Sequence, residues 1–434
     1  MASFGGRTDG CPTHPRGRGR KPSTEGEDAL SAKTRLGIMM FLQYAIWGAW
    51  APVLSAYLLD DLGFTGFQTG IIFALLPLAT IISPFIGGQA ADRYFSSEKV
   101  IAFLQLSGGV LLLVATWTTS FGAMAGVMLV YCLLYAPTLA LTNSVAMINL
   151  KDSEKEFGVI RVWGTLGWIA AGWALTGWRW MGQGNEGFAL QGDMLFLAGI
   201  ASIIMGIQSF TLPHTPPQKE GVKPWAFLES MKMMADRDFA IFMAITFVVS
   251  TELEFYYILT APFLLSESIG VSGEWLPMVM TVGQLAEIFV MAFMLSWALK
   301  KYGMRKTLAF GVIAWPIRYI IFAIGGPAWL VIASLALHGF CYVFFFVAAF
   351  IYVDKVAPAD IRASAQSMIA IVALGLGRFL GSLFAGWIQD TFTTETGVNW
   401  TGVFLVPCGL TFLCAVAFLL FFRERQSVAT PATP

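Results

Sequence analysis

Long apolar runs alternate with short polar connections along nearly the whole chain. A helix of about 20 predominantly apolar residues crosses a hydrocarbon core of about 30 Å. Twelve runs come within a few residues of this length. The pattern therefore predicts an all-α integral membrane protein with twelve transmembrane helices, expected over 36–59, 68–91, 100–119, 122–147, 159–181, 194–213, 239–265, 275–299, 307–325, 328–353, 363–389 and 401–422.

The composition supports a chain that is embedded in lipid. Hydrophobic residues fill 56% of the 434 positions, charged residues fill 12%, and the mean hydropathy is +0.68. Soluble domains are typically about 45–50% apolar and about 25% charged. An ordinary soluble globular protein is thereby excluded.

The distribution of Lys and Arg gives an independent test of the number of helices, because short loops rich in these residues stay on the cytoplasmic side. No Lys or Arg occurs in the connections at 60–67, 182–193, 266–274 or 390–400. This alternation predicts a multi-pass protein of the cytoplasmic (inner) membrane with both termini in the cytoplasm. Basic residues lie in the tails and in other connections, at 7–35, 92–99, 151–161, 219–237, 300–306, 355–362 and 423–425.

The longest polar connection inside the bundle begins with prolines and divides the twelve helices into two sets of six. Two such halves are the plan of a secondary transporter. The tail over 1–35 is rich in Gly, Pro and Arg, so we expect it to be disordered and cytoplasmic. The predicted divisions are this tail, a first half over 36–213, a linker over 214–238, a second half over 239–425 and a cytoplasmic tail over 426–434.

Several motifs resemble a known transporter family. The loop containing Gly88, Asp92 and Arg93 matches the first half of the loop motif of the major facilitator superfamily. The strings FLQYAIWGAW (41–50), YAPTLALTNSVA (135–146), IRVWGTLGWIAAG (160–172) and YVDKVAPADIRASAQ (352–366) are similar to the nucleoside:proton symporter family within that superfamily. The resemblance implies import of nucleosides by alternating access with proton coupling, and it gives Asp92 and Arg93 a role in conformational gating.

A nucleoside site needs aromatic faces for the base and polar groups for the ribose hydroxyls. Gln284 and Glu287 are three residues apart and so share one helix face, and the resemblance assigns both to substrate contact. The alternative is a structural hydrogen bond to a neighbouring helix. The resemblance also implies that the stripe of Arg161, Thr165 and Trp168 lines the cavity.

Two of these polar residues have alternatives of their own. Arg161 could instead be a cation at a loop end that pairs with Asp152 or Glu156. His338 and Tyr342 are further substrate-binding candidates by resemblance, whereas a single histidine in a packed helix is often structural.

Glu252 and Glu254 lie in one apolar run, about 200° apart on a helix, so they face different surroundings. Glu254 shares a face with Tyr257, and the resemblance places both in the substrate site. Acids inside a membrane span are costly and generally mark function. Glu287 and Glu254 are therefore the proton-coupling candidates, and a structural role is expected for Glu252.

Position 343 departs from the family, because Val343 stands where the resemblance leads us to expect an aspartate. Either Glu254 takes over the proton, or transport is not coupled to protons. The cations Arg318 and Arg378 lie within spans, and each is expected to have an acidic or carbonyl partner.

Other classes of function find little support. The five cysteines are scattered, histidines number three, and no phosphate-binding G-x-x-x-x-G-K-[ST] loop occurs. We therefore expect no catalytic residues, no metal, no cofactor, no nucleic-acid partner and no enzymatic activity, and we expect a monomer whose partners are nucleoside, protons and lipid. An uncoupled facilitator, a symporter of a sugar or nucleobase derivative, and a receptor that binds without transport remain as alternatives.

Overall fold

The computed structural model is a bundle of membrane-crossing helices, and it describes residues 25–83, 95–182, 191–217 and 227–424. A short hairpin of β1 (Thr393–Thr394) and β2 (Gly397–Val398) is the β-structure of this part of the chain. The first bundle of helices consists of α1 (Glu25–Trp50), α2 (Leu54–Ala56), η1 (Tyr57–Asp61), α3 (Gly66–Ser83), α5 (Ser97–Thr116), α6 (Phe121–Asn149), α7 (Ser153–Met181) and α8 (Asp193–Ser209).

The second bundle follows after two short connecting helices, α9 (Phe227–Ser230) and η4 (Met231–Ala235). Several of its spans are divided by π-helical turns. Its elements are α10 (Arg237–Leu265), α11 (Leu276–Met280), α12 (Val282–Phe289), η5 (Val290–Met294), α13 (Leu295–Ile324), α14 (Ala328–Ser334), α15 (Leu337–Cys341), η6 (Tyr342–Val347), α16 (Ala348–Val356), α17 (Arg362–Ala370), η7 (Ile371–Leu376), α18 (Gly377–Thr391) and α19 (Trp400–Phe421).

The predicted number of twelve spans is confirmed by these elements. Nine continuous helical stretches of the described chain are long and apolar enough to cross a membrane. One of them, Leu276–Ile324, contains two spans, because Gly303 interrupts the helix with φ 77° and ψ 172°. That backbone conformation is open to glycine and strained for other residues. The more polar α7 and the 17-residue α8 complete the set.

Helix starts follow from local chemistry in the polar connections. Asp152 caps α7, Asp236 caps α10 and Asn399 caps α19, each through a side-chain oxygen that accepts a backbone N–H of the first turn. Prolines such as Pro77 and Pro262 lie inside long helices, as is common in membrane spans whose neighbours satisfy the freed carbonyls.

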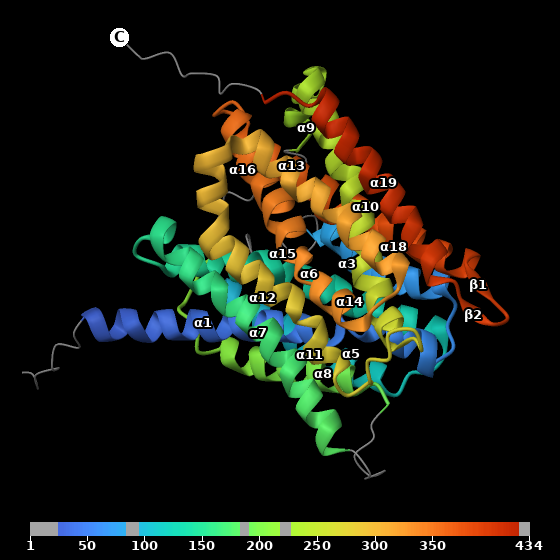
Figure 1. The fold of residues 1–434 in the computed structure, drawn as a ribbon. Coiled ribbons are helices and arrows are strands. Elements are labelled where there is room, and N and C mark those ends of the chain that lie inside the picture. Colours follow the sequence, from blue (N-terminus) through green and yellow to red (C-terminus); the bar gives the residue numbers. More distant parts are fainter. Residues whose placement is uncertain (1–24, 84–94, 183–190, 218–226, 425–434) are drawn as a thin grey trace, which may run out of the picture.

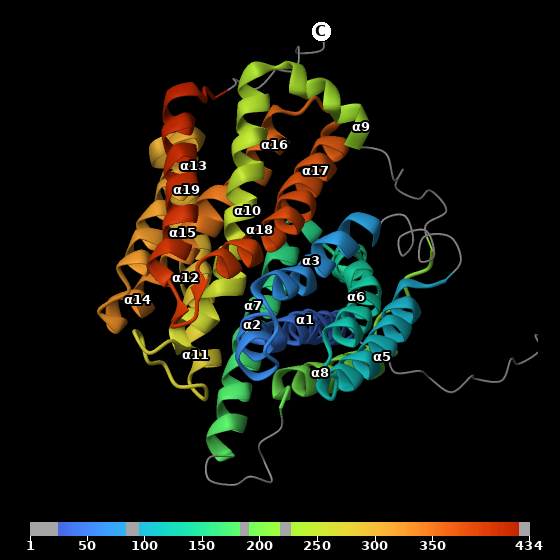
Figure 2. The same ribbon diagram turned by 90° about the vertical axis from the view of Figure 1, so that its right-hand side faces the viewer.

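The two bundles diverge from one another toward one end of the molecule (Figures 1 and 2). In the first bundle α1 packs on α7 and α8, and α5 packs on α6 and α8; in the second, α10 packs on α18 and α19, and α13 packs on α19. Contacts between the bundles come from α3 against α18, α7 against α11 and α2 against α10. We call the end carrying Lys33, Lys151, Lys300, Lys355 and Arg423 the basic end, and the other the opposite end.

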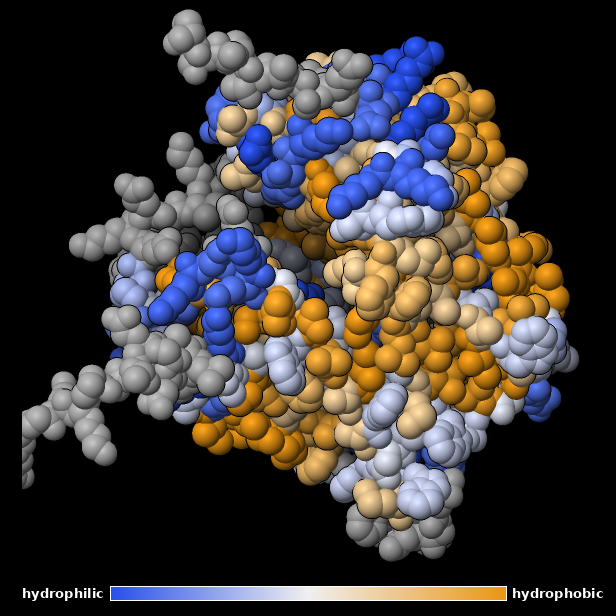
Figure 3. All heavy atoms as spheres, turned by 60° about the vertical axis from the view of Figure 1, so that its left-hand side comes forward, coloured by the Kyte–Doolittle hydropathy of each residue, from blue (hydrophilic) through white to orange (hydrophobic). Residues whose placement is uncertain are grey.

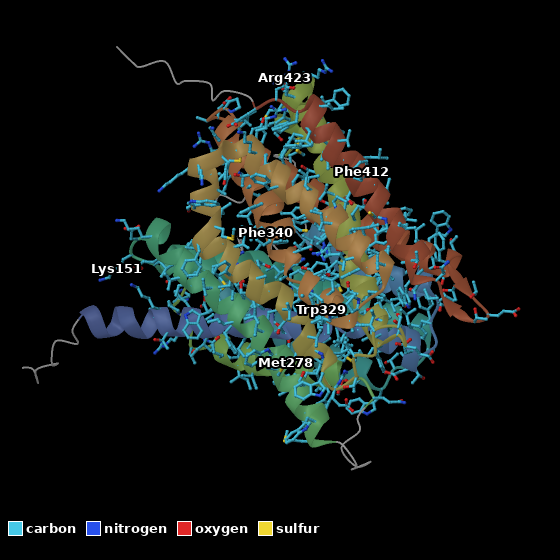
Figure 4. The ribbon with its side chains drawn as sticks, in the orientation of Figure 1. Lys151, Met278, Trp329, Phe340, Phe412 and Arg423 are labelled. Carbon is cyan, nitrogen blue, oxygen red and sulfur yellow. The ribbon has the colours of Figure 1, made fainter. Side chains whose placement is uncertain are left out.

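Figure 3 shows hydrophilic residues on two lobes with a hollow between them, and a hydrophobic flank beside them. In Figure 4, Lys151 of the first bundle and Arg423 of the second lie on separate lobes, at the left and the top, while Met278 lies toward the bottom. Large apolar side chains such as Phe103, Phe293 and Phe412 are exposed. Since lipid replaces water around a membrane bundle, these side chains are in their preferred surroundings.

Candidate functional site

Glu287 and Arg161 face one another from the two bundles. Glu287 lies in α12 and is half-buried, and Arg161 lies in α7 with its guanidinium carbon 4.0 Å from the centre of the Tyr44 ring. The two charges are close enough to interact electrostatically, yet they form no ion pair within 4.0 Å in the part of the chain that the structure describes. The arrangement places a hydrogen-bond donor on one bundle and an acceptor on the other.

The alternative expectation, that Arg161 pairs with Asp152 or Glu156, does not match the contacts of these two acids. Asp152 pairs with Lys155 at 2.8 Å, and Glu156 pairs with Lys33 at 2.8 Å. Both acids thus have other partners. Arg161 remains with the aromatic face of Tyr44, a cation–π arrangement that leaves guanidinium N–H groups available to a ligand.

Aromatic side chains of both bundles lie in the same region. Trp168 is 7% exposed and meets Trp47 edge-on, with ring centroids 5.3 Å apart. Tyr342 begins the π-helical turn η6 and stacks on His338 at 5.7 Å. Thr165 is half-buried one helical turn from Arg161. The flat rings and the polar groups are thus interleaved, as a ligand with a base and a sugar requires.

Gln284 and His338 belong to a buried polar group inside the second bundle. Gln284 is 6% exposed and its Oε1 has no partner within the described residues; the same holds for Nε2 of the fully buried His338 and for the hydroxyl of Tyr256. Tyr256 and His338 stack at 4.5 Å with an interplanar angle of 14°. Buried polar atoms are normally satisfied, so these three mark a place suited to a ligand or to ordered water.

Arg318 departs from the expectation of an acidic or carbonyl partner. It is fully buried, its Nη1 lies 3.4 Å from Nδ1 of His338, and its carbon Cζ lies 4.4 Å from the ring centre of Tyr256 and 4.6 Å from that of Trp315. No carboxylate lies within ion-pair distance of it in the described chain. Aromatic rings stabilise this cation instead. Such contacts cannot be recognised from the sequence, because they involve no pair of opposite charges.

Glu252 and Glu254 do face different surroundings. Glu252 is buried inside the second bundle, where its Oε1 accepts a hydrogen bond from Thr251 at 3.1 Å and its backbone carbonyl accepts one from the Tyr319 hydroxyl. Glu254 is 1% exposed and accepts hydrogen bonds from Arg378 at 2.5 Å and from Ser382 at 3.1 Å.

Arg378 joins the candidate site through its ion pair with Glu254; the sequence indicates only that this cation needs a partner. Its guanidinium carbon lies 5.2 Å from the ring centre of Tyr257 and 5.7 Å from that of Trp47. Tyr257 is half-buried and lies edge-on to His338 at 5.9 Å. Arg378 thus connects Glu254 to the aromatic wall of the other bundle.

The structure describes the surroundings of Val343 but not those of the predicted gating pair. Val343 is fully buried in the apolar core. Asp92 and Arg93, the predicted gating pair, lie outside the described residues. Within the described residues, no group of three or more His, Cys, Asp or Glu side chains could hold a metal ion.

The opposite end is closed by polar contacts between the bundles. Trp173 donates to Thr281 at 3.1 Å, and Arg179 donates to the Gly273 carbonyl at 2.9 Å while forming an ion pair with Asp193 at 2.7 Å. Outside this closure lies a cavity of about 420 Å³ lined by residues of both bundles. Its charged lining consists of Asp60, Asp61, Asp193, Glu274 and Arg179.

Comparison with known proteins agrees with this architecture. The family model described as Nucleoside H+ symporter matches residues 30–427. YegT of Escherichia coli (strain K12), a protein named for nucleoside transport, is 34% identical over 92% of this chain and 96% of its own length. Xanthosine permease of the same organism is 29% identical over 92% and 97%.

Solved structures share the fold. The crystal structure of a mutant of the nucleoside transporter NupG matches with a TM-score of 0.82 at 27% identity, covering 90% of this chain and 100% of that chain. A D-xylose–proton symporter matches with a TM-score of 0.67 at 12% identity, over 92% and 98% of the two chains. The latter likeness concerns the fold alone.

Proposed function

Because this chain belongs to the Nucleoside H+ symporter family, a family of transporters and not of enzymes, we propose that it imports nucleosides across the cytoplasmic membrane by alternating access, driven by protons. The relatives named for nucleosides and for xanthosine support this class of substrate. The distribution of basic loops supports a cytoplasmic location of the basic end and of both termini.

One observation carries the proposal: Glu287 and Arg161 face each other from the two bundles without an ion pair of their own. Ribose hydroxyls both donate and accept hydrogen bonds, so they can bridge a carboxylate and a guanidinium. A solute bound in this way contacts both bundles at once. Its binding and release are thereby linked to the relative position of the bundles, which alternating access requires.

The remaining substrate groups follow from the same geometry. Gln284, His338 and Tyr342 on the second bundle and Thr165 and Trp168 on the first offer amide, imidazole, hydroxyl and ring surfaces. The base would stack between the aromatic side chains while its edge pairs with the unpartnered Gln284 oxygen. In this proposal the basic end faces the cytoplasm, so the structure represents a state open to the inside.

Val343 favours a second candidate, an uncoupled nucleoside facilitator. A valine cannot take up a proton, and this one is buried among apolar neighbours. Proton coupling then depends on Glu287 or Glu254. If neither acid exchanges a proton during transport, substrate moves only down its own gradient.

The test is uptake of radiolabelled uridine and adenosine into proteoliposomes, with and without an inward proton gradient, using protein-free liposomes as the blank. Accumulation stimulated by the gradient supports symport. Uptake that equilibrates regardless of the gradient supports the facilitator. Absence of both uptake and counterflow of either nucleoside would refute nucleoside transport.

A further inference from the structure

The ion pair between Arg378 and Glu254 is the most enclosed contact between opposite charges that the structure describes. Arg378 Nε lies 2.5 Å from Glu254 Oε1, and the two side chains are 14% and 1% exposed. Ser382 donates to the second carboxylate oxygen at 3.1 Å. The pair joins α10 to α18, and each charge is satisfied mainly by the other.

A small cavity lies against this pair where the bundles meet. Its volume of about 10 Å³ is close to the minimum for one water molecule. Trp47, Trp50, Phe73, Leu76 and Pro77 line it from the first bundle, and Glu254, Tyr257 and Arg378 line it from the second. Among the lining residues, Glu254 and Arg378 carry the charges, so water at this point would contact Glu254 in an otherwise apolar enclosure.

Arg378 also lies near the proposed substrate groups. Tyr257 and Tyr342 each interact electrostatically with both Arg378 and Glu287. Glu287 has no ion-pair partner within the described residues. Arg378 is therefore paired with one carboxylate, Glu254, and shares its neighbours Tyr257 and Tyr342 with a second, Glu287.

We propose that Arg378 is the coupling residue of this carrier: a proton that binds Glu254 releases Arg378, which then turns toward Glu287 and the bound nucleoside. This inference rests on the proposed function. Hydronium transfers its proton to a Glu254 oxygen and leaves water, and the guanidinium stays charged throughout because arginine is not deprotonated in proteins. Return of the proton to the cytoplasmic side restores the pair.

The surroundings of Glu254 restrict what else could control its proton. From α18 it is faced by Arg378 and Ser382, and from its own helix by Tyr257. The residues of α1 and α3 that line the adjoining cavity are uncharged. Among the described residues, Arg378 is thus the single charge in direct contact with Glu254, and it also reaches Trp47 of the first bundle. Such an arrangement supplies proton coupling without an acid at Val343.

The decisive experiment neutralises both charges at once, in the double variant Glu254→Gln/Arg378→Gln. Wild type and variant are compared in proteoliposomes by gradient-driven accumulation of uridine and by uridine counterflow without a gradient. We expect an accumulation ratio that falls to one, while uridine counterflow persists at a reduced but measurable rate. The matched control is Lys355→Gln/Glu424→Gln, which removes an exposed ion pair of the same bundle at 3.0 Å and should leave both activities unchanged.

The outcomes distinguish the coupling role of Arg378 from nucleoside symport itself. Gradient-driven accumulation that survives in the double variant would overturn the coupling role of Arg378 while leaving nucleoside symport intact. Loss of counterflow together with accumulation in a monodisperse protein would also overturn it, because the pair would then be needed for transport itself. Wild type that fails to accumulate uridine would overturn the proposed symport and the inference with it.

If the double variant does not fold, a second variant tests the inference. Glu254→Asp keeps the acid but shortens the side chain that reaches Arg378, so the ion pair is weakened while a carboxylate remains. The accumulation ratio of uridine should therefore fall below that of wild type while counterflow persists. An unchanged accumulation ratio would overturn the inference.

Discussion

The carboxylate of Asp390 accepts hydrogen bonds from the backbone N–H groups of Gly66 at 2.6 Å and of Phe67 at 2.8 Å. Asp390 belongs to α18 and Gly66 begins α3, so one bundle caps a helix of the other. The unpaired N–H groups and the positive end of the helix dipole both favour an anion there. This contact must break before the opposite end can open.

Asp390→Asn should therefore shift the carrier toward a state that is open at the opposite end. Hydrogen bonds to charged groups contribute about 1.5–3 kcal/mol, and partial retention by the amide leaves a loss of about 1.4 kcal/mol, or tenfold in the equilibrium. The measurement is maleimide labelling of Ala56→Cys, which lines the cavity there, after replacement of the five native cysteines. Glu395→Gln removes an exposed acid at the same end and serves as control. Equal labelling rates in the two variants would contradict this role of Asp390.

Gly386→Ala should prevent the same closure by steric means. A Cβ at this position would lie 2.2 Å from the Gly66 carbonyl oxygen, a separation that only movement of a helix can relieve. Spin labels placed across the opposite end should show a longer distance distribution in Gly386→Ala than in wild type. Gly409→Ala is the control, since a Cβ there meets nothing within 4 Å. Identical distributions for all three proteins would show that α3 and α18 separate without regard to this contact.

Glu287→Gln should weaken nucleoside binding with little change in folding. The loss of a charged acceptor to a ribose hydroxyl costs about 1.5–3 kcal/mol, or roughly 10- to 150-fold in the dissociation constant. Isothermal titration of uridine into detergent-solubilised protein would measure the dissociation constant. The control is Glu229→Gln, at an exposed position. An affinity equal to that of the control would remove Glu287 from the substrate site.

Val343→Asp should destabilise the protein, even though the family resemblance leads us to expect an aspartate at this position. The side chain is fully buried in an apolar cluster, and an acid at the centre of a membrane helix costs about 2.5–3.5 kcal/mol. The unfolding midpoint in detergent should fall further than for Val343→Ala, which only trims the side chain. Stability equal to wild type would mean that water reaches position 343.

The fold was largely predictable because the hydropathy of the spans and the positions of Lys and Arg in the loops indicate the membrane topology. Gly303 illustrates the point: the helix breaks inside the basic connection at 300–306 that separated the predicted eighth and ninth spans. Helix ends were less predictable. The first predicted span begins at residue 36 after a tail expected to be disordered, whereas α1 already begins at Glu25.

The helix faces of the candidate site residues were predictable from the sequence, but their interaction partners were not. The angle between Glu252 and Glu254 follows from helix geometry alone, and the two side chains do have separate surroundings. The partner of Glu254, Arg378, is 124 residues away in the chain. A single sequence does not indicate which residues so far apart come into contact. The π-helical turns, such as η6 at Tyr342, add a residue to a turn and shift the faces that a period of 3.6 would assign.

The closed opposite end carries a kinetic consequence. Its polar contacts, among them Arg179 with Gly273 and Asp390 with Gly66, lower the free energy of one conformation, whereas the ion pairs at the basic end, such as Lys33 with Glu156 and Lys355 with Glu424, stay within one bundle. A ligand arriving from the less populated side has its apparent affinity reduced by the fraction of carriers open to it. With the proposed orientation, in which the basic end faces the cytoplasm, half-saturation should thus require more solute outside than inside, so the carrier responds to low concentrations of solute within the cell.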